Sequence, residues 1–500
     1  MEKILLINPS HSFRAKTHRS SVQGSIGLPL GILYVAAALE AKGCRVRVLD
    51  CLTAPRAEAW DSNDKVYYGL VPQLLRREIE EFKPDIVGIS SQFATQEENV
   101  LATAELVKDV DASISVVVGG ANVSCRAHRF LENRSIDIAA RTEGEEITGE
   151  LIEYFRGERR LDQVGGIAFR QGDGILESED HARLEDIDRI PFPAYHLIDM
   201  NCYLTLYKKG IYTRDRDVKR NMSMITSRGC PYRCVFCSVS QSMGKAWRPH
   251  SADYVARHIR YVSDAYKVGH IHFEDDNLMF DLDRFLKFVD VLAERSVTWD
   301  TPNGIRVNLA ITEAILKKFK RSGCKSLSMG VESGDQEVLN HIVRKGIRLP
   351  DVEEFARRCR NVDLPLRAFF ILGFPGETLG NMRKTVDFAL HLMDDYGVEV
   401  INLIATPIYG TELYALCESK GYLARPVTPQ TLSEAFIPDG YGLIGTESFS
   451  PADVENMSRE FTSKVYRRLL FKIGISHPIK SLKRVGNVYT LTRTIKRLWS

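Results

Sequence analysis

Hydrophobic and polar positions alternate between two periods over the first 155 residues, and this predicts a parallel sheet with helices on both faces. Short apolar runs typical of buried strands occur at 3–8, 44–50, 85–91, 113–120 and 136–142. Segments with helical spacing of apolar residues lie between them, at 30–42, 70–82, 96–110 and 145–156. Strands that alternate with helices predict a doubly wound, Rossmann-like α/β domain over residues 1–156.

A second alternating run begins at Met222. Its predicted strands are 222–226, 268–273, 297–305, 325–330, 365–372 and 398–404, and its predicted helices are 251–266, 281–294, 312–321, 335–361 with a break at Pro350, and 378–393. Six such units predict a partial, open (β/α)6 barrel over residues 221–410, with its active site at the carboxyl ends of the strands.

The remaining segments are less regular. Residues 157–220 are polar and predict a linker with a small hairpin at 165–178. Residues 411–500 predict a mainly helical C-terminal region that helps to shape the substrate pocket. From residue 464 onward this region contains Lys and Arg but no Asp or Glu, which predicts a solvated basic helix or a docking tail for an acidic partner.

The composition narrows the class of protein. Hydrophobic residues make up 44% and charged residues 26% of the 500 residues, as in globular chains with several domains. The net charge of +2 gives no general case for nucleic acid as a partner. The N-terminal apolar run is too short for a signal peptide, and the longest apolar stretch, 28–39, is too short to span a membrane. We therefore expect a cytoplasmic protein without a transmembrane segment.

Three of the ten cysteines crowd into one stretch, at Cys230, Cys234 and Cys237. Three thiolates can hold three irons of a 4Fe-4S cluster and leave the fourth iron open. Ferredoxin-type carriers use four cysteines per cluster, and structural zinc closes its shell with four ligands. The nearest further candidates, Cys202 and His250, lie outside the motif. An open cluster therefore fits this spacing best.

At this motif the chain resembles the radical S-adenosylmethionine (SAM) enzymes, whose signature C-x3-C-x-aromatic-C is matched by the three cysteines and Phe236. The resemblance implies that SAM binds the open iron through its amino and carboxylate groups. It also implies that an external electron donor such as ferredoxin or flavodoxin reduces the cluster, and that SAM then yields a 5′-deoxyadenosyl radical.

Later motifs of this family follow in the right order. They are an acidic segment at 272–277, a Gly-Val-Glu-Ser-Gly segment at 330–334, a Gly-Phe-Pro-Gly-Glu-Thr turn at 373–378, and Thr406-Pro407 after the last strand. The residues that the resemblance implies for SAM binding are Phe236, Asp275, Asp276, Arg306, Glu332, Ser333, Gly373, Pro375 and Gly376.

The doubly wound domain in front resembles that of the cobalamin-binding subfamily, as do the segments 27–34, 141–146 and 190–195. A G-x-G-x-x-G turn is absent, which argues against a dinucleotide. The residues expected to contact cobalamin lie at the strand ends: Asn8, Pro9, Ser90, Ser91, Gln92, Gly119, Gly120, Ala121, Glu143 and Gly144. The D-x-H-x-x-G motif of a histidine that binds cobalt is not matched around His11. We therefore expect His11 to be a loop histidine and not a lower cobalt ligand.

The resemblance implies methylation of an unactivated carbon. One SAM would methylate cobalamin, a second would form the radical that removes hydrogen from the substrate, and the substrate radical would take the methyl group. No motif identifies the substrate. A protein or peptide residue, such as those of methyl-coenzyme M reductase, a lipid, a tetrapyrrole and a natural-product intermediate all stay open.

Three alternatives remain at this point. An oxidative cyclase or ring-rearranging enzyme would use both cofactors without net methyl transfer. A methylthiotransferase acting on tRNA or a ribosomal protein would need three further N-terminal cysteines, but residues 1–221 hold only four at irregular spacing: Cys44, Cys51, Cys125 and Cys202. A non-catalytic iron–sulfur regulator or electron carrier would have no need of the SAM motifs.

Overall fold

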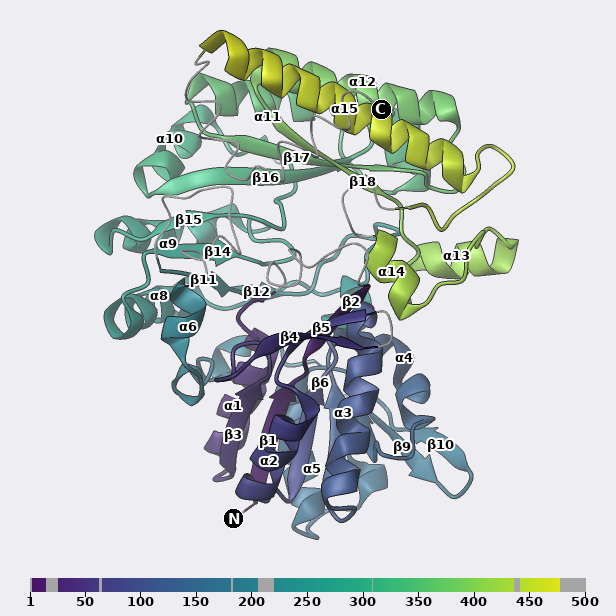
Figure 1. Ribbon diagram of the computed structural model, residues 1–500. Helices are drawn as coiled ribbons and strands as arrows, with labels where there is room; N and C mark the ends of the chain where they lie inside the picture. The colour runs from purple at the N-terminus through teal and green to yellow at the C-terminus, as the bar shows by residue number, and fades with distance from the viewer. Residues whose placement is uncertain are drawn as a thin grey trace.

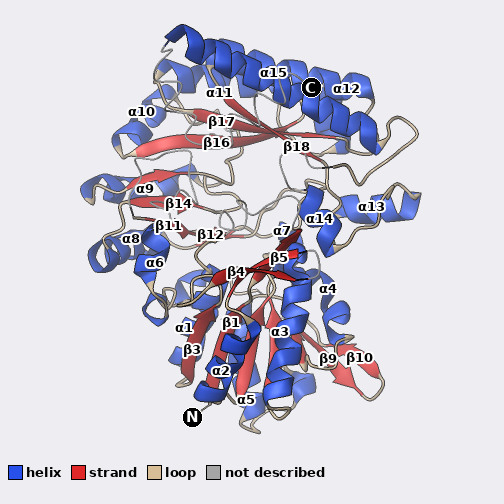
Figure 2. Ribbon diagram, in the orientation of Figure 1, coloured by secondary structure: helices blue, strands red, loops and turns tan. Residues whose placement is uncertain are grey.

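Two sheets built mainly from parallel strands, one above the other in Figure 1, form the framework of the molecule. The computed structural model describes residues 2–14, 26–62, 65–180, 183–205, 220–307, 309–435 and 441–476. The predicted fold class is confirmed: a doubly wound N-terminal domain precedes a six-stranded partial barrel and a helical C-terminal region (Figure 2).

The N-terminal sheet has the strand order β10-β9-β8-β7-β6-β1-β3. The strands β3, β1, β6, β7 and β8 are parallel. The hairpin β9–β10 adds two antiparallel strands at the β8 edge. The chain changes its winding direction between β3 and β6, so the ligand crevice of such a sheet lies outside the carboxyl ends of β1 and β6. The strands are β1 (Lys3–Asn8), β3 (Arg45–Asp50), β6 (Ile86–Ser90), β7 (Ser115–Gly119), β8 (Ile138–Ala140), β9 (Ile167–Gln171) and β10 (Gly174–Glu177).

Alternating side chains of these strands pack on opposite faces of the sheet, and β8, β9 and α5 share a further small core. Leu5, Val87 and Val116 pack under α2, α3 and α4, whereas Ile4, Leu6 and Ile86 face α1. Helix α5 lies beside α1. These helices are α1 (Leu30–Ala41), α2 (Pro72–Phe82), α3 (Glu97–Val110), α4 (Ala121–Leu131) and α5 (Gly144–Phe155).

Two features of this domain are absent from the sequence-based prediction. Helix α4 follows β7, and a small antiparallel sheet lies between the two large sheets (Figure 1). This small sheet joins β2 (His11–Arg14), β5 (Lys65–Gly69) and β4 (Glu58–Ser62). Its strands are short and partly exposed, so their apolar periodicity is weak.

The second sheet carries six parallel strands in chain order and does not close into a barrel. β15 is shorter than the predicted 297–305, because the chain leaves the sheet after Asp300 and returns for a single bridge between Ile305 and Met329. The strands are β11 (Asn221–Met224), β14 (His270–Phe273), β15 (Thr298–Asp300), β16 (Cys324–Glu332), β17 (Leu366–Leu372) and β18 (Glu399–Ile404).

Helices cover the convex face of this sheet. They are α8 (Ala252–Tyr266), α9 (Leu282–Glu294), α10 (Glu313–Arg321), α11 (Leu349–Asn361) and α12 (Leu379–Tyr396). The predicted helix 335–361 is interrupted: a π-helical turn at Val338–Ile342 precedes α11, which has Pro350 in its first turn, where a proline costs no hydrogen bond. Shorter elements are α6 (Met200–Thr205), β12 (Ser227–Arg228), α7 (Val239–Ser242) and β13 (Arg248–Pro249).

The C-terminal region consists of α13 (Glu412–Lys420), α14 (Pro429–Ala435) and α15 (Pro451–Ser476). Helix α15 lies over β18 and α12, where Asn402 donates a 2.7 Å hydrogen bond to the Ser458 hydroxyl (Figure 1). The basic stretch after residue 476 is outside the described residues. In the described part of the chain, no helix combines the length and the apolar character that crossing a membrane requires.

Candidate functional site

One cavity of about 1060 Å³ extends from the carboxyl edge of the N-terminal sheet to the concave face of the second sheet. This volume lies at the upper end of the roughly 300–1,000 Å³ that is typical of small-molecule pockets. Polar strand residues such as Ser223, His272 and Asp300 line it from the second sheet, while their neighbours Met224, Ile271 and Trp299 pack against the helices. The cavity therefore has walls from both domains and the size of a large small-molecule site.

All ten residues expected to contact cobalamin lie at the wall of this cavity. Some of them already have partners within the protein. The Asn8 amide donates to Asp50 at 2.9 Å, and the Ser91 hydroxyl accepts from Asn122 at 3.1 Å. These two side chains shape the wall by holding the strand ends together.

The two adjacent glycines at the end of β7, Gly119 and Gly120, differ in how much space surrounds them for a side chain. A Cβ on Gly120, which has φ +115°, would lie 2.7 Å from the Ser91 carbonyl oxygen, so chain packing alone excludes a side chain there. A Cβ on Gly119 would meet only Ala140 at an ordinary 3.5 Å. Of the two, only Gly119 leaves space that the protein itself does not need.

Glu143 is engaged by arginines of the second domain. Its carboxylate accepts hydrogen bonds from Arg248 and Arg228, and the adjacent Glu145 lies 2.5 Å from Arg228. All four side chains are at most 10% exposed. We call these four residues the interdomain clasp. Because Glu143 belongs to it, its carboxylate is committed to domain docking although the residue borders the cavity.

His11 is not a loop residue as expected. It begins strand β2 opposite Tyr68 and is 8% exposed, and burial lowers the pKa of its imidazole to about 4. The sequence pattern missed the strand because β2 pairs only with the short β5. His11 borders the cavity as a neutral, buried side chain.

A second arm of the cavity, between the N-terminal sheet and helices α1 and α5, was not predicted. Leu6, Val117, Leu151 and Phe155 line it. A Cβ on Gly88, in the middle of β6, would lie 2.6 Å from the Leu6 side chain. A glycine inside a strand signals a close approach, and Gly88 was the available sequence signal for this arm.

The three cysteines lie in the loop after β12, half-buried and without disulfides. Gly229 starts this loop with φ +79°, and a Cβ there would meet the Ala246 carbonyl oxygen at 2.2 Å. The cysteines themselves do not line the cavity, but Arg228 before them and Ser242 and Met243 after them do. Burial, together with nearby Cys234 and Asp276, raises the pKa of Cys237 to about 11. Free thiols in one short loop can serve as ligands of a metal cluster, which would stabilise their thiolate form.

Arg306 and Tyr232 meet beside this loop. The guanidinium of Arg306 lies 3.7 Å from the centre of the Tyr232 ring and donates to the Gly346 carbonyl oxygen at 2.7 Å. Phe236 of the motif packs against Phe374 of the Gly-Phe-Pro turn, with ring centres 5.8 Å apart. The structure thus brings Phe374, 138 residues after Phe236, and Arg306, 74 residues after Tyr232, to the cysteine loop.

Lys345 belongs to none of the motifs found in the sequence. Its ammonium lies 2.7 Å from the Glu332 carboxylate, and both side chains are at most 14% exposed. Burial disfavours the charged ammonium, but Glu332 and nearby Cys234 outweigh burial and raise the pKa of Lys345. Glu332 has φ +72°, which is unusual for a residue with a side chain. The expected contact between Glu332 and SAM would therefore be made by a paired carboxylate.

The two aspartates of the acidic segment have separate roles. Asp275 is buried, and its carboxylate accepts hydrogen bonds from the Thr226 amide and hydroxyl and from the Ser227 hydroxyl. Asp276 reaches solvent, yet the surrounding protein desolvates its carboxylate and Asp275 repels it, so its pKa is raised to about 6. Asp276 is therefore the carboxylate available to a cationic ligand, whereas Asp275 holds the loop.

The Ser333 hydroxyl is also committed inside the protein, since it bonds to Thr385 at 2.9 Å and accepts from the Asp335 amide. In the 373–378 turn, Gly373 and Gly376 both have positive φ, Pro375 is buried between them, and a Cβ on Gly373 would meet Val454 of α15 at 2.9 Å. Buried Glu377 accepts from the Gly373 and Phe374 amides and so fixes the turn.

Comparison with known proteins gives two family matches. Residues 21–152 match the B12 binding domain, and residues 224–389 match the radical SAM superfamily. The two matches fall on the two sheets described above.

Curated relatives include both methylating and cyclising enzymes. The chain is 28% identical to a cytidylyl-2-hydroxyethylphosphonate methyltransferase of Streptomyces wedmorensis, over 84% of this chain and 83% of that protein. It is 26% identical to an anaerobic magnesium-protoporphyrin IX monomethyl ester cyclase of Cereibacter sphaeroides, over 63% of this chain and 50% of that protein. The solved structure of the cobalamin-dependent SAM radical enzyme OxsB with aqua-cobalamin and SAM bound matches with a TM-score of 0.72 and 16% identity, covering 99% of this chain and 70% of that one.

Proposed function

The chain belongs to the cobalamin-dependent radical SAM enzymes, and its relatives include methyltransferases. We propose that it methylates an unactivated carbon of a substrate bound between its two sheets. Its cofactors are a 4Fe-4S cluster, SAM and cobalamin. When bound, the cluster with SAM supplies a radical that abstracts hydrogen, and cobalamin supplies the methyl group. An external reductant such as ferredoxin or flavodoxin would provide the electron.

One observation carries this proposal: a single cavity is bordered by the predicted cobalamin residues and by both flanks of the cysteine loop. Chemistry that uses two cofactors on one substrate needs both of them at one space, because reaction requires the reacting atoms in near contact. The buried ion pairs of the interdomain clasp hold the two walls in register.

In this proposal, Cys230, Cys234 and Cys237 hold the cluster, Asp276 accepts from the methionyl amine of SAM, and Arg306 faces its carboxylate. Charge complementarity supports both assignments. Phe236, Gly373, Pro375 and Gly376 form the wall next to the nucleoside. On the other side, Pro9, Ser90, Gln92, Gly119, Ala121 and Gly144 border the corrin, and the apolar arm beneath α1 and α5 takes its nucleotide tail.

The wall on the second sheet supports a polar small molecule as the substrate. It presents His272, Glu274 and Asp300 along with the ion pair between Arg367 and Glu399, which are 3.1 Å apart. A lipid chain would offer these charged and polar groups no hydrogen bond of its own. A protein or peptide residue, such as those of methyl-coenzyme M reductase, would have to enter the same space between the domains.

The test is anaerobic turnover of the reconstituted protein with cobalamin, SAM and reductant, with and without a metabolite extract freed of protein. Methylation predicts that 5′-deoxyadenosine and S-adenosylhomocysteine rise together and that one metabolite gains a methyl mass. Deoxyadenosine alone, with a product of unchanged carbon count, would instead establish the cyclase alternative. The protein removed from that extract is assayed in parallel. Activity only with this protein fraction would favour a peptide or protein substrate.

The matched control is Cys234→Ala. Two thiolates do not hold the cluster, so 5′-deoxyadenosine and S-adenosylhomocysteine formation should fall to background. The absorbance of bound cobalamin should not change. Deoxyadenosine formation by this variant would contradict the assignment of the cysteines.

A further inference from the structure

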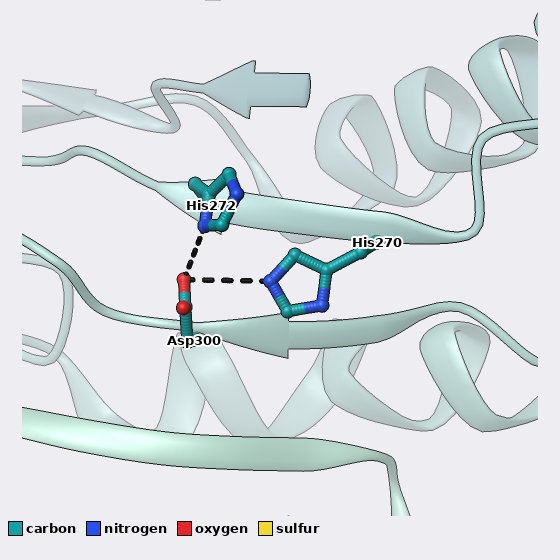
Figure 3. Close-up of side chains that lie close together, drawn as sticks. All are labelled: His270, His272 and Asp300. Atoms are coloured by element: carbon teal, nitrogen blue, oxygen red, sulfur yellow. Dashed lines mark hydrogen bonds and ion pairs between the residues drawn. The ribbon is translucent and has the colours of Figure 1, made fainter. Parts of the chain in front are cut away.

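Three side chains that could bind a metal converge on the second sheet, away from the cysteine loop. His270 and His272 lie two residues apart on β14, so both face the same side of the sheet, and β15 pairs in a register that sets Asp300 opposite His272 (Figure 3). One oxygen of Asp300, Oδ1, lies 2.7 Å from His272 Nδ1 and 3.6 Å from His270 Nε2. Their possible ligand atoms all lie within 4.8 Å of one another.

The hydrogen bonds of Thr298 determine which nitrogen of His270 is free to bind a metal. The Thr298 hydroxyl donates to the Gly269 carbonyl oxygen at 3.1 Å and lies 2.8 Å from His270 Nδ1. A hydroxyl has one proton, so both bonds are satisfied only if His270 donates from Nδ1. A neutral imidazole that donates from Nδ1 carries its lone pair on Nε2. Metal-binding histidines are held in this way, with the second ring nitrogen donating to a protein oxygen.

The lone pair on Nε2 points at a carboxylate oxygen. Among the described residues Nε2 has no hydrogen-bond partner, and the His270 side chain is only 1% exposed. Two electron-rich atoms that face each other repel, and a cation between them removes the repulsion. Lys325 is near His270 but its side chain is exposed, so its ammonium remains solvated.

We propose that His270, His272 and Asp300 form a binding site for a divalent transition metal, with Zn²⁺ as the reference ion. Ligand bonds of about 2.0–2.2 Å around a tetrahedral ion separate the ligand atoms by about 3.4 Å. Asp300 Oδ1 lies 3.6 Å from His270 Nε2 and 2.7 Å from His272 Nδ1, so the second pair must open slightly to admit the ion. Two imidazoles and one carboxylate leave at least one coordination position open. His272 and Asp300 line the cavity, so the open position faces it and can take an oxygen of a bound molecule.

The test is a zinc titration of the full-length chain, monitored by competition with a chromophoric chelator under anaerobic conditions. The Cys230→Ala, Cys234→Ala, Cys237→Ala background removes the cluster thiolates as competing ligands. We expect one zinc ion per chain, and zinc-edge X-ray absorption should show nitrogen and oxygen ligands that include two imidazoles. The metal content of the reconstituted wild-type enzyme should likewise show one divalent ion beyond the cluster iron and the cobalt.

Asp300→Asn and His272→Gln, each in that background, should weaken zinc binding at least 10-fold, and Thr298→Val should weaken it about 10- to 100-fold by releasing the His270 ring. His341→Gln is the control, because His341 is exposed and pairs only with Glu337 in a surface turn. Circular dichroism shows which variants fold, and any one folded variant decides the result. His341→Gln should bind one zinc ion with the affinity of the parent background. Absence of a zinc site in the parent background, or unchanged affinity in the folded Asp300→Asn, His272→Gln or Thr298→Val variants, would overturn the proposal.

Discussion

Arg228, in the strand that leads into the cysteine loop, lies 2.5 Å from Glu145 of the N-terminal domain, and both side chains are at most 10% exposed. Each group offsets the cost of burying the other. The Arg228 guanidinium also lies 5.2 Å from the centre of the Tyr34 ring on α1. This pair connects the domain expected to hold cobalamin to the loop expected to hold the cluster.

Glu145→Gln should therefore destabilise the protein by about 3 kcal/mol, because it leaves a buried guanidinium short of one carboxylate. Chemical denaturation of the folded protein measures this change. Glu132→Gln is the control, since Glu132 pairs with Arg129 on the surface and its loss should cost less than about 1 kcal/mol. Equal losses of unfolding free energy in the two variants would show that the clasp stabilises the protein no more than a surface ion pair does.

Gly119 and Gly120 provide a test of the cobalamin wall. Gly119→Val should keep the protein folded, because its side chain has room among the protein atoms, and should reduce cobalamin affinity at least 10-fold by filling the cavity edge. Gly120→Ala should instead lower the unfolding temperature, because its Cβ clashes with the Ser91 backbone. Cobalamin absorbance after gel filtration and thermal melts separate the two effects. Normal cobalamin retention by Gly119→Val would place the corrin elsewhere.

The two aspartates of the acidic segment form a second matched pair. Asp276→Asn should raise the KM for SAM about 10-fold with little change in stability, because it removes an accessible carboxylate. Asp275→Asn should destabilise the protein by about 1–3 kcal/mol, because it weakens the acceptor for buried Thr226 and Ser227 donors. Deoxyadenosine formation against SAM concentration and denaturant melts measure these outcomes. The reverse pattern would reassign the two roles.

Glu377 should make stability depend on pH. Burial raises the pKa of its carboxyl to about 7, and one of its oxygens, Oε1, has no hydrogen-bond partner among the described residues. Between about 4.5 and 7 the folded protein holds a proton that the unfolded chain has lost, so this group favours folding at low pH and the benefit is lost as pH rises through 7. We expect the unfolding temperature to fall between pH 5.5 and 8, and to fall less in Glu377→Gln. A variant with an unchanged slope would contradict this origin.

His11→Ala should leave the visible spectrum of bound cobalamin unchanged, since His11 belongs to a paired strand and lacks the motif of a cobalt ligand. Binding itself should weaken less than 10-fold. A shift of the cobalamin bands in this variant would identify His11 as a lower ligand and correct the assignment.

Local sequence patterns determined the fold class and the nature of the cofactors. The spacing of Cys230, Cys234 and Cys237 is local, so the motif can be recognised without coordinates. The strand and helix periods are also local, and they predicted the parallel sheets because burial imposes those periods. Two short elements left no such trace: β4 is mostly exposed, and β2 buries the polar side chains of His11 and Ser12.

Only the tertiary structure decided how individual side chains are used. Glu143 pairs with arginines 85 and 105 residues away, and Glu332 pairs with Lys345. The Asp275 carboxylate accepts hydrogen bonds from Thr226 and Ser227, whereas the adjacent Asp276 is exposed. The meeting of His270, His272 and Asp300 depends on the register of two strands. Which partner a polar group finds depends on how separate elements dock, and that information is spread over the whole packed chain.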